Sequence, residues 1–184
     1  MVDDEITMAK CSVESTKTNA FMNNFAEMKK LKYGVKKCHK MHVGPKTTKC
    51  SDIRVHNESG STVQTDKYCG DLISSNGSNV EKIKERCDRG FGIVNYIISI
   101  LEELPLGQFH IPTGLKLREA MLINGLIFNS ESWYNLKDEE IKKLSSIDEM
   151  LMRKILKAPA TTCKEVLFLE AGCQQINFTP LRED

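Results

Sequence analysis

The stretch 79–101, N-V-E-K-I-K-E-R-C-D-R-G-F-G-I-V-N-Y-I-I-S-I-L, decides the fold of the second half of the chain. Asn79 is a suitable helix N-cap, because its side chain can accept a hydrogen bond from a free backbone N–H of the first turn. Apolar residues then recur at three- and four-residue spacing, as on one face of an amphipathic helix: Val80, Ile83, Cys87, Ile93, Val94, Ile97, Ile98 and Leu101. Gly90 and Gly92 each weaken the middle of such a helix by roughly 1 kcal/mol relative to Ala. The stretch predicts one long helix with an apolar face.

Three shorter helical patterns follow, after a break at Pro105–Gly107. The first starts at Thr113 and carries Leu115, Leu117, Met121, Leu122 and Leu126. The second covers 138–156, with Ile141, Leu144, Ile147, Met150, Leu151 and Ile155 inward. The third covers 164–169 and ends before Gly172. Residues 76–184 are therefore predicted to form an antiparallel helical bundle.

Residues 1–75 have a different pattern. Positions 1–9 alternate like a strand, and a helix is predicted from Ser12 to the stop at Gly34, with Phe21, Phe25, Met28 and Leu31 on its apolar face. Short strand patterns occupy 38–43, 53–56 and 67–74, separated by a loop at 57–64. The predicted fold class is α+β: short antiparallel strands plus one helix in 1–75, then the helical bundle in 76–184.

Composition sets limits on the function. The chain has 184 residues, 40% of them hydrophobic and 28% charged, which suffices for a buried core. A net charge of +1 gives no overall preference for nucleic acid. The seven cysteines are an odd number and no signal peptide precedes them, which indicates reduced thiols in the cytoplasm or nucleus. The longest apolar run, 93–101, is too short to cross a membrane.

Positive charge is concentrated in one segment. Eight lysines lie within positions 29–49, with Glu27 just upstream. Lys36, Lys37 and Lys40, beside Tyr33 and Tyr68, are candidates for contacts with a nucleic-acid backbone. A solvated lysine face is the alternative interpretation.

Two groups of residues suggest metal ligands. Adjacent carboxylates such as Asp3 and Asp4 are commonly solvated turn or cap residues, but they can also hold Mg²⁺, which takes oxygen ligands. Cys38, His39, His42 and Cys50 do not have the spacing of a zinc finger, and neighbouring strand residues point to opposite faces, so alternating strand residues are preferred there. The set Ser130, Ser132 and His110 shows no nucleophile arrangement. Trp133 and Tyr134 are expected to be packing residues.

Five stretches, taken in order, resemble the polymerase of non-LTR (LINE-like) retrotransposons. V-D-D-E-I-T-M-A-K-C looks like the catalytic box of reverse transcriptases, and K-K-C-H-K-M-H-V-G like the strand after the next palm helix. D-K-Y-C-G-D-L-I-S resembles their primer-grip hairpin. L-R-E-A-M-L-I-N-G-L-I-F-N-S-E-S-W-Y-N-L looks like the thumb helix, and I-D-E-M-L-M-R-K-I-L-K-A-P-A-T-T-C-K-E-V-L-F-L-E-A-G-C like the segment beyond it. The resemblance extends over residues 1 to about 175 and is carried by the order of the stretches.

The resemblance implies an RNA-directed DNA polymerase that uses an RNA template, a DNA primer and dNTPs. It makes Asp3 and Asp4 catalytic ligands of Mg²⁺, and Tyr68 and Gly70 the primer grip. Lys37 matches a lysine near the incoming nucleotide, with Lys36 a rival for the same role. It also divides the chain into a partial palm, 1–75, and a thumb with a following segment, 76–184.

The chain also departs from the family pattern. Met1 stands in the place of an aromatic residue, Cys69 in that of Leu, and Cys163 in that of Pro. The fingers and the palm strand with a third metal-binding aspartate have no counterpart. The expectation is therefore a fragment that is inactive alone, with its first strand left as an exposed edge. A non-catalytic helical module that binds nucleic acid or another protein is the alternative.

Overall fold

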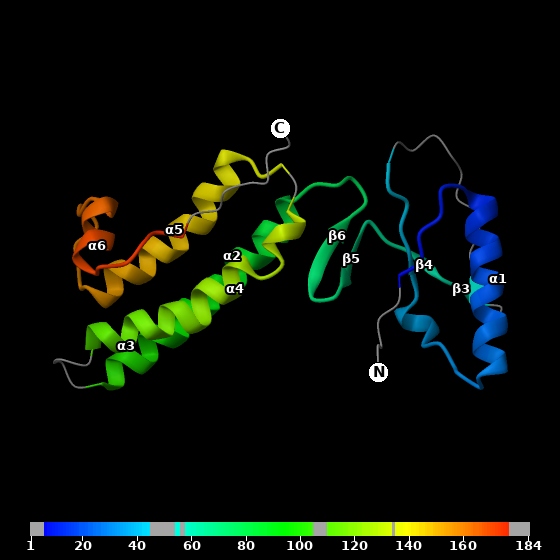
Figure 1. Ribbon diagram of the computed structural model, residues 1–184, viewed down its shortest axis with the longest axis horizontal. Coiled ribbons are helices and arrows are strands. Elements are labelled where there is room, and N and C mark those ends of the chain that lie inside the picture. The colour runs from blue at the N-terminus through cyan, green and yellow to red at the C-terminus, as the bar shows by residue number, and fades with distance from the viewer. Residues whose placement is uncertain (1–5, 45–53, 56–57, 105–109, 134, 177–184) are drawn as a thin grey trace. The chain divides into compact units, whose positions relative to one another are not determined.

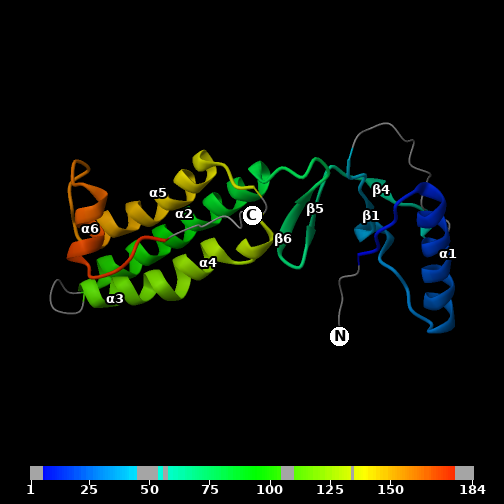
Figure 2. The ribbon, with the colours of Figure 1, turned by 45° about the horizontal axis from the view of Figure 1, so that its top comes forward.

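The computed structural model describes residues 6–44, 54–55, 58–104, 110–133 and 135–176. The chain forms two compact units, Met1–Ser78 and Asn79–Asp184. Among the described residues, helices occur together with short two-stranded pairings, so the mixed helix-and-sheet composition expected for an α+β chain is confirmed. Figures 1 and 2 show the helices and strands of each unit.

Helix α1 (Ser12–Met28) follows the N-cap position Cys11. The chain leaves the helix at Lys30, whose φ of 55° is left-handed. The N–H of Leu31 then donates to the carbonyl of Ala26 at 2.8 Å, and the N–H of Lys30 to that of Glu27 at 3.1 Å, the two bonds of a Schellman cap. The helix therefore ends before the predicted stop at Gly34.

Two predictions for this part of the chain are wrong. The first is the strand over positions 1–9, because residues 6–9 form no strand. Residues 1–5, which include Asp3 and Asp4, lie outside the described residues. The second is the apolar face of α1. The predicted apolar face of α1 is exposed at Phe21, Phe25, Met28 and Leu31, and Ala26 is the buried residue of this helix.

The strands of the first unit are shorter than predicted. A 3₁₀ turn, η1 (Val35–Lys37), precedes β1 (His39–Lys40), and β2 (Arg54–Val55) pairs antiparallel with β3 (Glu58–Ser59). Strand β1 pairs with β4 (Ser61–Thr62) in parallel, so an all-antiparallel group is wrong for this pair. In this parallel pair His39 lies opposite Ser61 and Lys40 opposite Thr62.

The stretch 67–74, predicted as one strand, belongs to a hairpin of β5 (Thr65–Tyr68) and β6 (Asp71–Ser74). The reversal occurs at Cys69 and Gly70, whose φ angles are 49° and 78°. Two positive φ angles in a two-residue loop are the pattern of a type I′ turn, whose twist matches that of the flanking strands.

The second unit is helical. It consists of α2 (Val80–Glu103), α3 (His110–Leu117), a π-helical segment η2 (Arg118–Ile123), α4 (Asn124–Ile127), the 3₁₀ turn η3 (Ser130–Ser132), α5 (Asp138–Ile155) and α6 (Lys164–Glu170). Segments α3, η2 and α4 continue one another and run opposite to α2 and α5 (Figures 1 and 2). The predicted ends of α2 and α5 agree with the structure within two residues.

The core of this unit is made of apolar side chains from α2, η2, α4, α5 and α6, together with Trp133: Ile83, Val94, Ile97, Leu101, Leu122, Leu126, Trp133, Leu144, Ile147, Leu151, Met152, Ile155 and Phe168. Gly90 lies where α2 meets the other helices. A Cβ atom there would stand 2.9 Å from Leu126 Cδ2 and 3.2 Å from Ile147 Cγ2. Gly90 lowers the intrinsic stability of the helix, but it lets Leu126 and Ile147 pack closely against α2, which a larger residue would prevent. A Cβ atom at Gly92 would face open space.

Candidate nucleic-acid interface

The lysines singled out in the sequence lie on one short segment of the first unit. Lys36 and Lys37 are exposed on η1, and Lys40 is half-buried on β1. Hydrogen bonds hold the segment in place: the N–H of Lys37 donates to the carbonyl of Gly34 at 2.7 Å, and that of Val63 to the carbonyl of Lys40 at 2.9 Å. The backbone that carries the lysines is thus positioned by a turn and by a strand pairing.

The same segment is attached to the β5–β6 hairpin. His39 Nδ1 lies 3.0 Å from Asp66 Oδ2 on β5. The N–H of Gly44 donates to the carbonyl of Ser75, just after β6, at 3.4 Å. Tyr68 is two residues beyond Asp66 and therefore on the same face of the strand. The lysine segment and the hairpin, predicted from separate motifs, accordingly lie beside one another.

The predicted primer-grip residues occupy the turn end of this hairpin. Tyr68 is half-buried and pairs across the strands with Asp71, which is buried. Gly70 is exposed in the left-handed turn, next to Cys69. The printed contacts join the lysine segment to the open end of the hairpin, through His39 with Asp66 and Gly44 with Ser75, whereas Tyr68 and Gly70 lie toward its turn end.

The electrostatic character of the segment is uniform. From position 28 to position 51 the chain contains no Asp or Glu. The lysines exposed on the described part of this stretch are Lys29, Lys30, Lys32, Lys36 and Lys37. Each exposed charge interacts only weakly in water, but several together attract a polyanion, and binding then releases its counterions. This surface suits a phosphate backbone.

The described residues give no support for a metal site. No group of three or more His, Cys, Asp or Glu side chains among them is placed to hold a metal ion. His39 is engaged by Asp66, burial raises the pKa of the Cys38 thiol, and Cys50 lies outside the described ranges. A thiol with a raised pKa is a poorer zinc ligand at neutral pH, because zinc binds the thiolate. In the parts of the chain that the structure covers, no helix is long and apolar enough to span a membrane.

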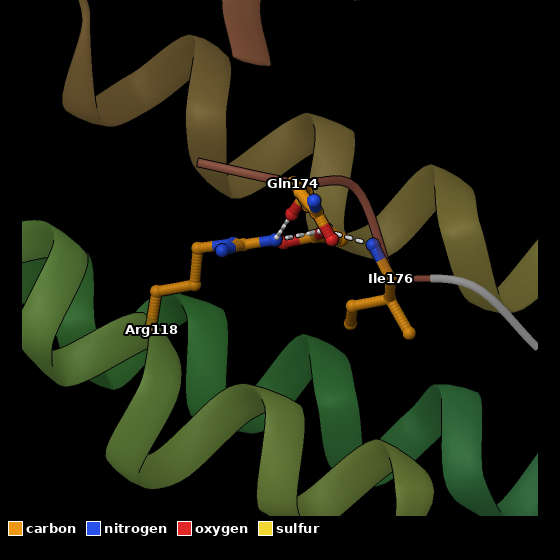
Figure 3. A network of polar contacts seen from close by, with 4 residues as sticks. Arg118, Gln174 and Ile176 are labelled. Atoms are coloured by element: carbon orange, nitrogen blue, oxygen red, sulfur yellow. Dashed lines mark hydrogen bonds and ion pairs between the residues drawn. The ribbon is translucent and has the colours of Figure 1, made fainter. Parts of the chain in front are cut away.

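Sequence reasoning missed the main polar feature of the second unit, the pair Arg118 and Asp148. Both side chains are buried, with exposed fractions of 2% and 0%. The guanidinium donates to both carboxylate oxygens, at 2.5 Å from Nε and 2.6 Å from Nη2. Arg118 Nη2 also donates to the carbonyl of Gln174, at 2.9 Å. The backbone N–H of Ile176 donates to Asp148 Oδ2 at 3.4 Å. Figure 3 shows how Arg118, Gln174 and Ile176 converge.

The pair connects three segments far apart in the sequence: the π-helical segment, α5 and the residues after α6. The Arg118 guanidinium also lies over the Phe168 ring, 5.5 Å from its centre. Burial tends to lower the pKa of Arg118, but the hydrogen bonds and charge of Asp148 outweigh this and raise it. The pair is a structural cross-link rather than a reactive site.

The comparisons with known proteins give no relative. No protein-family profile, no curated protein and no solved structure matches the chain.

Proposed function

We propose that the chain is part of the reverse transcriptase of a non-LTR retrotransposon, and that its own contribution is to hold the template–primer duplex. In this proposal the first unit belongs to the palm and carries the primer grip, and the second unit is the helical thumb. The parent activity is RNA-directed DNA synthesis, in which a primer 3′-hydroxyl attacks the α-phosphate of a dNTP.

The observation that carries the proposal is the attachment of the lysine segment to the hairpin. The two stretches resemble different elements of the polymerase, and the contacts from His39 to Asp66 and from Gly44 to Ser75 put them side by side. Lysines would contact phosphates while the tight turn of the hairpin offers backbone groups to a primer end. Such phosphate contacts supply most of the affinity for nucleic acid and are independent of sequence.

The catalytic part of the proposal rests on Asp3 and Asp4. These two carboxylates would hold Mg²⁺, which stabilises the charge on the transferring phosphoryl group. Because the matched stretches supply two of three metal-binding aspartates, we expect no primer extension by this chain alone. Extension that Asp3→Asn abolishes would refute this expectation.

The binding proposal is tested with a fluorescent RNA–DNA duplex and the full chain, by anisotropy over a series of salt concentrations. Lys36→Ala combined with Lys37→Ala removes two exposed charges, so the slope of log K against log salt should fall by about 1.8, at roughly 0.9 per lost phosphate contact. A matched control removes Lys10 and Lys17, which are exposed in the first unit outside the lysine segment. Equal losses in both double variants would refute a specific role of the lysine segment.

A non-catalytic binding module is the second candidate, favoured by the exposure of Lys36 and Lys37. It makes the same binding prediction, and binding persists in Asp3→Asn under both candidates. Addition of a separately expressed palm and fingers distinguishes the two candidates. Restored extension supports the polymerase, and binding without extension supports the module.

A further inference from the structure

A surface concavity of about 440 Å³ lies at the carboxyl end of α1. Its lining residues are Glu27, Lys30, Leu31, Lys32 and Tyr33. The Schellman cap creates it, because the left-handed Lys30 turns the chain back and brings Leu31 within hydrogen-bonding reach of Ala26. The concavity is therefore defined by backbone geometry and lies at the start of the lysine segment.

The walls suit a flat ring. Tyr33 is half-buried, so its ring is held in place while part of it remains accessible. Leu31 is 55% exposed, and the aliphatic stems of Lys30 and Lys32 add apolar surface below their charges. Bases of single strands stack on such aromatic side chains whatever their sequence. The volume lies in the range of small-ligand sites.

Glu27 determines which part of a nucleotide can enter. The lining carries one carboxylate, Glu27, and two lysines, Lys30 and Lys32. The carboxylate opposes a phosphate placed directly beside it, so we assign the neutral base to the space beside Glu27 and Tyr33 and the phosphates to the lysines. A carboxylate accepts hydrogen bonds from exocyclic amino groups, which cytosine, adenine and guanine have. Uracil and thymine lack this group and offer only the ring N3–H as a donor. The phosphates on either side of that base would then face the lysines of the rim and of η1.

We infer that this concavity is a single-strand nucleic-acid subsite that takes one unpaired base and prefers bases with an exocyclic amino group. The inference rests on the proposed function, since it names a second form of nucleic acid for the same basic segment. In a template–primer complex it would receive an unpaired base of the strand.

An anionic membrane is the other surface that lysines beside exposed apolar residues can bind. Phe25 and Met28 are 41% and 79% exposed next to the concavity. A bilayer surface would leave the concavity unfilled and press the Glu27 carboxylate against anionic headgroups, which is unfavourable. The carboxylate therefore favours nucleic acid.

The test measures anisotropy of three probes with the full chain: a twelve-nucleotide oligocytidine, an oligouridine of the same length and a blunt RNA–DNA duplex. Tyr33→Ala should weaken oligocytidine binding about tenfold, as expected for loss of one stacking contact, and leave duplex binding unchanged. Glu27→Gln should reduce the preference for cytidine over uridine, because an amide can also donate to uracil. Tyr96→Ala is the matched control, as Tyr96 is 56% exposed on α2.

The possible results separate this inference from the proposed function. Unchanged oligocytidine binding in Tyr33→Ala, with circular dichroism identical to that of the parent chain, would overturn the subsite alone. Duplex binding without single-strand binding by the parent chain would do the same. Binding of neither probe at low salt would overturn both. Retention on phosphatidylserine vesicles that requires Tyr33, without oligonucleotide binding, would assign the surface to a membrane instead.

Discussion

The buried pair of Arg118 and Asp148 allows a quantitative prediction about stability. Asp148→Asn removes the negative charge but nearly preserves the shape of the side chain. Arg118, 2% exposed, then remains as a buried cation without its counter-charge, and one of its two bonds to the carboxylate becomes repulsive because the amide presents N–H groups. The substitution should therefore destabilise the helical unit without creating a cavity.

The expected cost is about 3–5 kcal/mol, the usual range when one partner of a buried ion pair is removed. A unit of this size loses at least 4 °C in melting temperature for each kcal/mol, so the midpoint should fall by about 12 °C or more. Glu85→Gln is the control: its pair with Arg89 is partly exposed, at 3.2 Å, and should contribute less than about 1 kcal/mol.

Tryptophan fluorescence gives the assay its specificity. Trp133 is the single tryptophan of the chain and is 2% exposed in the helical core, so its emission reports unfolding of this unit. Urea and thermal unfolding are followed for the parent chain, Asp148→Asn and Glu85→Gln. A decrease in the free energy of unfolding of less than about 1 kcal/mol for Asp148→Asn would refute the reasoning, because a buried guanidinium without a counter-charge destabilises the folded state by more than this.

The stabilisation by this pair also has a defined pH dependence on the arginine side. The folded-state pKa of Arg118 is raised above its unfolded-state value, which is itself strongly alkaline. Its contribution is therefore fully present below the unfolded pKa and is lost only as pH rises through the folded pKa. The difference in stability between the parent chain and Asp148→Asn should accordingly stay constant from about pH 6 to pH 8, below the range in which the nearby Cys173 thiol, whose pKa is raised by burial, ionises.

Three further predictions follow from the backbone and the thiols. Gly90→Ala should destabilise the helical unit by about 1–3 kcal/mol, because the added methyl group overlaps Leu126 and Ile147. Gly92→Ala faces open space and should stabilise the unit by up to about 1 kcal/mol. Urea unfolding followed by tryptophan fluorescence distinguishes the two variants. Cys69→Asn should stabilise the hairpin by about 0.5–1 kcal/mol, because Asn adopts positive φ more readily; amide exchange of β5 and β6 measures this, and faster exchange would contradict it. Iodoacetamide should modify exposed Cys163 before Cys173, because burial raises the pKa of the Cys173 thiol. Peptide mass spectrometry at pH 7.5 measures the order of modification, and the reverse order would contradict the prediction.

The helical unit was largely predictable because its signal is local. In α2 and α5 the apolar residues recur with the period of the helix, and the acidic first turn of α5 marks where that helix begins. Asn79 stands at the predicted N-cap position of α2, but its side chain makes no capping hydrogen bond. The strands of the first unit were less predictable. Alternation over 38–43 extends further than the pairing, which depends on a partner strand 22 residues away at β4.

The buried ion pair could have been suspected from an interruption of the apolar pattern. Arg118 falls in register with Leu115 and Leu122, and Asp148 with Leu144 and Leu151, all positions that face a core. A charge at such a position requires a partner, but the pattern does not identify it, because the partner lies 30 residues away on another helix. The concavity beside α1 carried no sequence signal, since it depends on the left-handed conformation of a lysine.

The Arg118 network also bears on the order in which the helical unit assembles. Its contacts join residues separated by 30 and 56 positions, so they can form only after three segments have met. Contacts of such long range are costly to close early in folding and contribute little to a transition state built from neighbouring helices. The network should therefore mainly slow unfolding of the helical unit and so lengthen the lifetime of its folded state, with little effect on the rate of folding.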